Sequence, residues 1–105
     1  MLERDRTILE QFAARVRALH PEARIWAFGS RVRGKAEADS DLDVCVVLDR
    51  VNANIRCLIS DVAWEVGFDR DLLISTVVFS TEMFERGRCS VSSLVRTIRE
   101  EGVAT

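Results

Sequence analysis

Histidine and paired cysteines are almost missing from this chain of 105 residues. His20 is the only histidine, and it directly precedes the only proline, Pro21, at a predicted helix end. The three cysteines, Cys45, Cys57 and Cys89, form no C-x-x-C pair. A histidine-based catalytic triad, a zinc site and a disulfide framework are therefore disfavoured. We expect the cysteines to be small buried side chains in a reducing cytoplasm.

The chain has little that would direct it to a membrane. Its N-terminus, MLERDRTILEQF, carries alternating charges and no apolar core of a signal peptide. No apolar run approaches the roughly 18 residues of a membrane span. We therefore expect a cytoplasmic protein that makes no membrane contact.

An excess of positive charge is also missing, because the net charge is −2. Direct binding of nucleic acid usually needs a basic face, so we do not expect it. The sequence contains no repeat and no linker, which predicts a single domain over residues 1–105. A core of this size gives marginal stability, so association with a partner or a homo-oligomer is compatible with the composition.

Helices and strands alternate along the chain. Apolar residues at helical spacing predict a first helix that ends before Pro21, a second over about 52–67 and a last one over about 91–102. Apolar and β-branched runs predict strands at 24–28, 42–48 and 71–80. A short helix is expected after Ser80, which is a good N-cap. The segment 30–35 is predicted as a helical turn or loop, and 36–40 as a loop.

This order of elements predicts an α/β or α+β fold. The strand at 42–48 is apolar on both faces, which is typical of a central strand covered on both sides. The expected architecture is therefore a small mixed sheet of about three to four strands flanked by helices.

Two acids stand at the entrance to the central strand. If the strand starts near Asp41, alternation places the Asp41 and Asp43 carboxylates on one face, with Leu42 on the other. Two carboxylates are costly to bury unpaired, and a hard divalent cation would offset that cost. A D-x-D pattern alone is also common in solvated turns.

A Gly-Ser pair ends the preceding strand. Gly29 would let backbone N–H groups approach a phosphate, and Ser30 adds a hydroxyl donor. Arg31, Arg33 and Lys35 place cations nearby. A capped turn with solvated basic residues would explain the same pattern.

The spacing of these two features is more specific than either one. In GSRVRGKAEADSDLD, ten residues separate the Gly-Ser pair from the D-x-D pair, and Ser40 precedes the first aspartate. The segment resembles the minimal nucleotidyltransferases of the DNA polymerase β-like superfamily, whose signature is G-S, ten residues, then D-x-D. The initial helix, the third strand holding another acid and the C-terminal helix ending in E-G-V extend the resemblance over nearly the whole chain.

The resemblance implies an Mg²⁺-dependent transferase that uses a nucleoside triphosphate such as ATP. It assigns Gly29, Ser30, Arg33 and Ser40 to nucleotide binding. It assigns two Mg²⁺ ions to Asp41, Asp43 and a third acid on a later strand. "GFDRDLLIS" offers Asp69 and Asp71 for that third place, and we favour Asp71 because it opens the third predicted strand.

The resemblance also implies a partner. Stand-alone minimal chains of this family are typically antitoxins that transfer AMP to a HEPN-domain toxin. The alternative is a non-catalytic antitoxin that masks its toxin and keeps a vestigial nucleotide site. Transfer to a small molecule is disfavoured because no acceptor domain is present. For Trp64 and Phe84, core packing is favoured over a role in partner binding.

Overall fold

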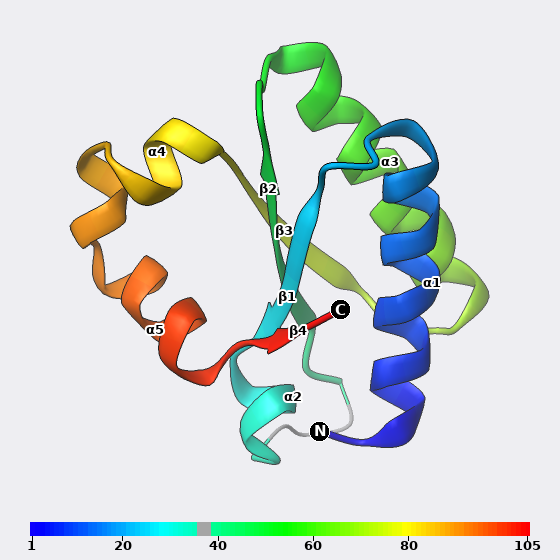
Figure 1. Ribbon diagram of the computed structural model, residues 1–105. Helices are drawn as coiled ribbons and strands as arrows, with labels where there is room; N and C mark the ends of the chain where they lie inside the picture. Colours follow the sequence, from blue (N-terminus) through cyan, green and yellow to red (C-terminus); the bar gives the residue numbers. More distant parts are fainter. Residues whose placement is uncertain (36–38) are drawn as a thin grey trace.

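A computed structural model of the chain describes residues 1–35 and 39–105. The predicted loop at 36–40 therefore lies partly outside the described residues. The helices and strands, shown in Figure 1, are α1 (Glu3–Leu19), β1 (Arg24–Phe28), α2 (Ser30–Arg33), β2 (Leu42–Leu48), α3 (Ala53–Asp69), β3 (Ile74–Ser80), α4 (Thr81–Glu85), the 3-10 helix η1 (Arg88–Val91), α5 (Ser93–Glu101) and β4 (Val103–Ala104).

The strands form one mixed sheet in the order β3-β2-β1-β4. β1 runs antiparallel to both β2 and β4, and β2 runs parallel to β3. The parallel pair needs a long connection, which α3 provides. The predicted mixed sheet with flanking helices is confirmed, and β2 is a central strand as expected.

The two faces of the sheet are covered by different helices. Alternation along β2 turns Val44 and Val46 toward α1 and α3, while Cys45 and Val47 pack with residues of α4 and α5. In Figure 1, α1 and α3 lie on one side of the sheet and α4 and α5 on the other. Asp43, two residues before Cys45 in β2, projects from the same face of the sheet as Cys45 and Val47.

Several helix starts follow local capping chemistry. The side chain of Asn52 accepts a hydrogen bond from the Ile55 amide, and Ser80 accepts one from the Met83 amide. These contacts confirm Ser80 as an N-cap and identify Asn52 as the N-cap of α3.

Other expectations are wrong in detail. β3 begins at Ile74, so Asp71 precedes the strand and does not open it. Phe84 is fully buried as expected, but Trp64 is 61% exposed on α3. Cys45 is buried, whereas Cys57 is exposed, because its position lies outside the apolar stripe of α3.

Candidate active site

The Gly29 turn and Asp43 lie against each other. Phe28, at the end of β1, is the register partner of Asp43 in β2, so the next residue, Gly29, passes beside the Asp43 side chain. Gly29 has φ +83, and a Cβ atom at this position would overlap the Asp43 carboxylate oxygen Oδ2. Only glycine combines this backbone conformation with so close an approach.

The two aspartates lie at the start of β2. Asp41 directly precedes the strand and Asp43 is its second residue, and both are half-buried. The pKa of Asp43 is raised above its ordinary value, mainly by burial and further by the negative charge of Asp41. The positive charge of Arg33 acts in the opposite direction. Burial and the charge of Asp41 together outweigh the effect of Arg33.

Arg31 has a structural role that the sequence did not reveal. Its side chain is buried, and Nη1 donates to both carboxylate oxygens of Asp5 in α1 at 3.2 Å. Its Nε donates to the Ser40 carbonyl at 2.7 Å. Arg31 thereby joins α2 to α1 and to the residue that precedes Asp41. The signal in the sequence is the place of Asp5, three residues before Ile8 on the buried stripe of α1.

The remaining predicted nucleotide-binding residues surround the acids. Arg33 is exposed, and its Nη1 lies 3.4 Å from the Glu101 carboxylate at the end of α5. Ser30 begins α2, which is a single turn, and its side chain is partly accessible. Ser40 is half-buried beside Arg31. The structure thus brings Gly29, Asp43 and Arg33 together, with the others adjacent in sequence.

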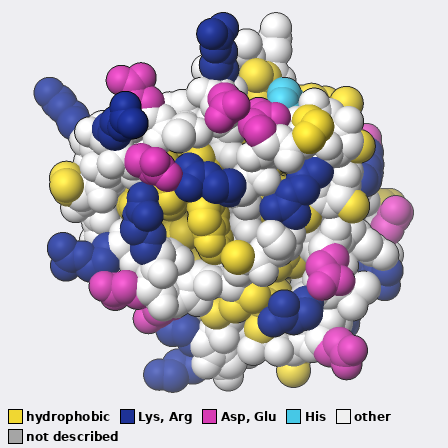
Figure 2. Space-filling view, in the orientation of Figure 1, with side chains coloured by type: hydrophobic (Ala, Val, Ile, Leu, Met, Phe, Trp, Pro, Cys, Tyr) yellow, Lys and Arg dark blue, Asp and Glu magenta, His cyan; other side chains and the backbone are white. Residues whose placement is uncertain are grey.

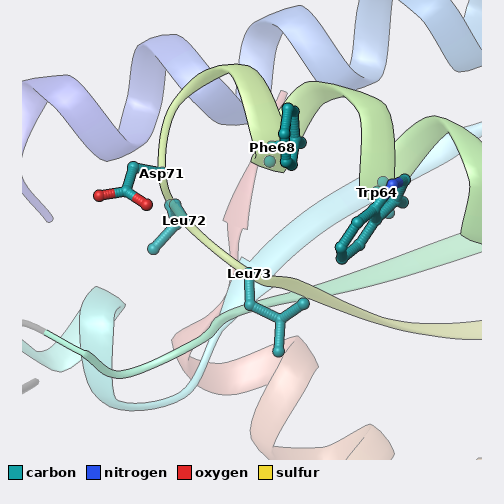
Figure 3. Close-up of a pocket in the computed structure, with 7 residues that line it drawn as sticks. Trp64, Phe68, Asp71, Leu72 and Leu73 are labelled. Carbon is teal, nitrogen blue, oxygen red and sulfur yellow. The ribbon is translucent and has the colours of Figure 1, made fainter.

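The candidate third acids lie elsewhere. Asp71 occupies the turn between α3 and β3 with φ +53 and is exposed. It borders a cavity of about 380 Å³ lined by α3 and this turn, and in Figure 3 its carboxylate points away from the Trp64 and Phe68 rings. Asp69 lines a hollow with residues of α1, including Gln11.

Among the described residues, no cluster of three acidic side chains includes any of these aspartates. Within residues 1–35 and 39–105, no three His, Cys, Asp or Glu side chains gather closely enough to hold a metal ion. The assignment of Asp71 as the third metal ligand therefore stays a prediction from the resemblance, without support from the arrangement. A single Mg²⁺ does fit the residues present, because Mg²⁺ commonly takes one or two carboxylates and completes its shell with phosphate oxygens and water.

The face of the molecule that Figure 2 shows carries charges of both signs. Figure 2 shows acidic and basic side chains interspersed on one face, around a hollow of hydrophobic side chains.

No helix in the described parts of the chain is long and apolar enough to cross a membrane.

Comparison with known proteins places the chain in a family. The model of the family described as "Nucleotidyltransferase domain" matches residues 9–104, which include both aspartates and the Gly-Ser pair. The "Probable protein adenylyltransferase MntA" of Haemophilus influenzae is 48% identical over 42 residues. That match covers 40% of this chain and 31% of the MntA sequence.

Solved structures share the fold at lower identity. A toxin–antitoxin complex with AMP-PNP superposes with a TM-score of 0.59 at 19% identity, covering 90% of this chain and 70% of the other. A mutant of the MntA–HpeT toxin–antitoxin pair gives 0.58 at 17%, covering 98% and 72%. A protein from Sulfolobus solfataricus gives 0.55 at 18%, covering 97% and 82%. With the family model matched over most of its length, the chain belongs to the nucleotidyltransferase domain family.

Proposed function

We propose that this chain is an Mg²⁺-dependent nucleotidyltransferase that moves AMP from ATP to a hydroxyl group of a partner protein. The observation that carries the proposal is the placement of Asp41 and Asp43 at the start of β2, with the Asp43 carboxylate directly against the Gly29 turn. Both carboxylates are half-buried, and burial and the neighbouring charge of Asp41 raise the pKa of Asp43, so a cation here would be favourable. Gly29 leaves room for an anionic ligand to approach.

Each nearby residue has a role in this proposal. Asp41 and Asp43 hold Mg²⁺ on the triphosphate, and the ion supplies charge neutralisation at the reacting phosphate. The Gly29 backbone and the Ser30 hydroxyl bind phosphate oxygens, with Ser40 completing the turn. Arg33 adds a positive charge beside them, and its exposed contact with Glu101 can exchange for a phosphate contact at small cost.

The transfer itself forms one bond and breaks one. The acceptor oxygen bonds to the α-phosphorus of ATP, the bond from that phosphorus to the bridging oxygen breaks, and pyrophosphate leaves. The hydroxyl proton of the acceptor passes to solvent. The chain contributes mainly by holding the triphosphate in line with the acceptor.

The partner we propose is a HEPN-domain toxin, with this chain as its antitoxin. The name of the MntA relative and the toxin–antitoxin structures with the same fold support this setting. The test is to incubate the protein with α-labelled ATP, Mg²⁺ and the protein encoded by the neighbouring gene, as the candidate toxin. We expect label on the toxin, and no label with Asp41→Asn/Asp43→Asn.

A matched control separates loss of the site from loss of negative charge. Asp61→Asn removes an exposed carboxylate on α3, far from the Gly29 turn in sequence, and should label normally. Failure of the unaltered protein to label any acceptor, or undiminished labelling by the double variant, would refute the transferase proposal.

The alternative is an antitoxin that acts by masking alone. The observation that favours it is that no third acidic side chain joins Asp41 and Asp43 among the described residues. Under this alternative, Asp41→Asn/Asp43→Asn would still bind the toxin tightly and neutralise it. Under the transferase proposal, the double variant would bind without durable neutralisation.

A further inference from the structure

The parallel pairing of β2 and β3 identifies the side chain next to Asp43. In the register of the two strands, Asp43 is paired with Ser75. Side chains of register partners in a sheet project from the same face, about 4.8 Å apart at the backbone. Ser75 therefore stands beside the Asp43 carboxylate on the face where Asp41 and Asp43 lie.

The rest of that face of β3 is closed. Val77 and Phe79, the next residues in the same alternation, pack against the cluster formed with α4 and α5. Ser75 itself is exposed. It is thus the β3 side chain on this face that is both next to Asp43 and open to a ligand.

Neither acid of the α3–β3 turn takes this place. Alternation puts Leu73, which is apolar and 53% exposed, on the same face as Ser75 and next to the Asp41 position. Asp71 lies two residues further back, in a left-handed turn before the strand. Asp69 faces a hollow shared with α1, on the opposite side of the sheet.

From this register we propose that Ser75 restricts the site to one divalent ion bound together with the nucleotide. The inference rests on the proposed function, since it concerns the same site. Two ions about 4 Å apart repel each other, so a two-ion site needs several negative ligands. Asp41 and Asp43 supply two, and a neutral hydroxyl at position 75 adds a weak ligand without charge.

The register also predicts how to change the number of ions. Ser75→Asp would put a third carboxylate beside Asp43, on the open side of the site. The variant should bind a second ion about tenfold more tightly or better, because a new negative charge acts at short range on a divalent cation. Ser60→Asp adds the same charge at an exposed serine of α3 and is the matched control.

The experiment counts Mn²⁺ ions bound per protein, by electron paramagnetic resonance, with a saturating non-hydrolysable ATP analogue. We expect one ion for the unaltered protein, for Ser60→Asp and for Asp71→Asn, and two for Ser75→Asp. Circular dichroism of each variant confirms that it is folded.

Each other outcome has a definite meaning. Two tightly bound ions in the unaltered protein would overturn the inference and leave the proposed function standing. Loss of an ion in Asp71→Asn would overturn it in the same way, by making Asp71 a ligand. One ion in Ser75→Asp would show that position 75 does not reach the site. No bound ion or nucleotide in the unaltered protein would overturn both proposals.

Discussion

At the scale of single residues, Gly29 is the position with the least tolerance for change. Its φ of +83 is unfavourable for any side chain, and a Cβ atom would overlap the Asp43 carboxylate. Strained conformations of this kind cost about 1–3 kcal/mol, and the overlap adds to that cost. Gly29→Ala should therefore lower the free energy of unfolding by at least about 2 kcal/mol, as measured by urea denaturation.

Gly34 provides the control for this prediction. It has φ +73, but a Cβ atom there would meet nothing within 4 Å. Gly34→Ala should carry only the conformational cost, about 1 kcal/mol. Equal losses in the two variants would mean that the contact with Asp43 adds nothing.

The residues of the site differ in how far the sequence could reveal them. The positions of Gly29 after one strand and of Asp41 and Asp43 at the start of the next were predictable because they are local features, whereas their functional roles come from the resemblance and stay predictions. Ser75 was not predictable, because its place beside Asp43 depends on the register between β2 and β3. A shift of one residue would turn it to the other face, and no pattern within β3 sets that register.

At the scale of elements, the buried Asp5–Arg31 pair fixes α2 against α1. Both side chains are almost fully buried, and Arg31 also holds the Ser40 carbonyl ahead of β2. Removing one member of such a pair leaves a buried charge without compensation, which costs about 3–5 kcal/mol. Asp5→Asn should lower the free energy of unfolding by about that amount.

The control is Glu10→Gln, an exposed acid on the same helix, which should change stability by less than about 0.5 kcal/mol. Replacing both partners, in Asp5→Leu/Arg31→Met, should recover part of the loss because no charge then remains buried. A double variant as unstable as Asp5→Asn would indicate that the hydrogen bond to Ser40 outweighs the ion pair.

Elements with strong periodicity were predictable, and those set by tertiary contacts were not. The helices α1 and α3 and the central strand β2 follow from their apolar patterns. The start of β3 was misplaced, because Leu72 and Leu73 continue the apolar run of the strand but lie outside it, after the turn at Asp71. β4 is a two-residue strand that exists through its pairing with Trp26 and Ala27 of β1.

At the scale of the whole molecule, α3 leaves an apolar surface uncovered. Trp64 and Phe68 are 61% and 72% exposed, and their rings lie 5.8 Å apart on the outer side of the helix. The sequence placed Trp64 in the core, because the apolar residues of α3 extend around more of the helix than one sheet face can cover. Exposed aromatic pairs of this kind are typical of surfaces that contact other proteins.

Replacing Asp43 should change the stability of the whole molecule in opposite directions with and without ligand. In the folded protein the pKa of Asp43 is raised above 3.8, chiefly by burial and then by the charge of Asp41. The native state therefore holds this proton more tightly than the unfolded chain, and stability falls as the pH rises from about 4 through the raised pKa. Without divalent ions, Asp43→Asn should be more stable than the unaltered protein at pH 7 and should lose this advantage toward pH 4.

Ligand should reverse that order. A ligand that binds only the folded state at one hundred times its dissociation constant adds about 2.7 kcal/mol, which raises the melting temperature of a domain this size by several degrees. ATP analogue with Mg²⁺ should therefore raise the melting temperature of the unaltered protein and of Asp61→Asn, but not of Asp43→Asn. Thermal melts at pH 4 and pH 7, with EDTA or with Mg²⁺ and analogue, measure both effects. Asp43→Asn removes charge repulsion in the free protein and removes ion binding in the liganded one. An Asp43→Asn variant that is less stable than the unaltered protein in EDTA at pH 7 would show that the ionised Asp43 carboxylate does not destabilise the free protein.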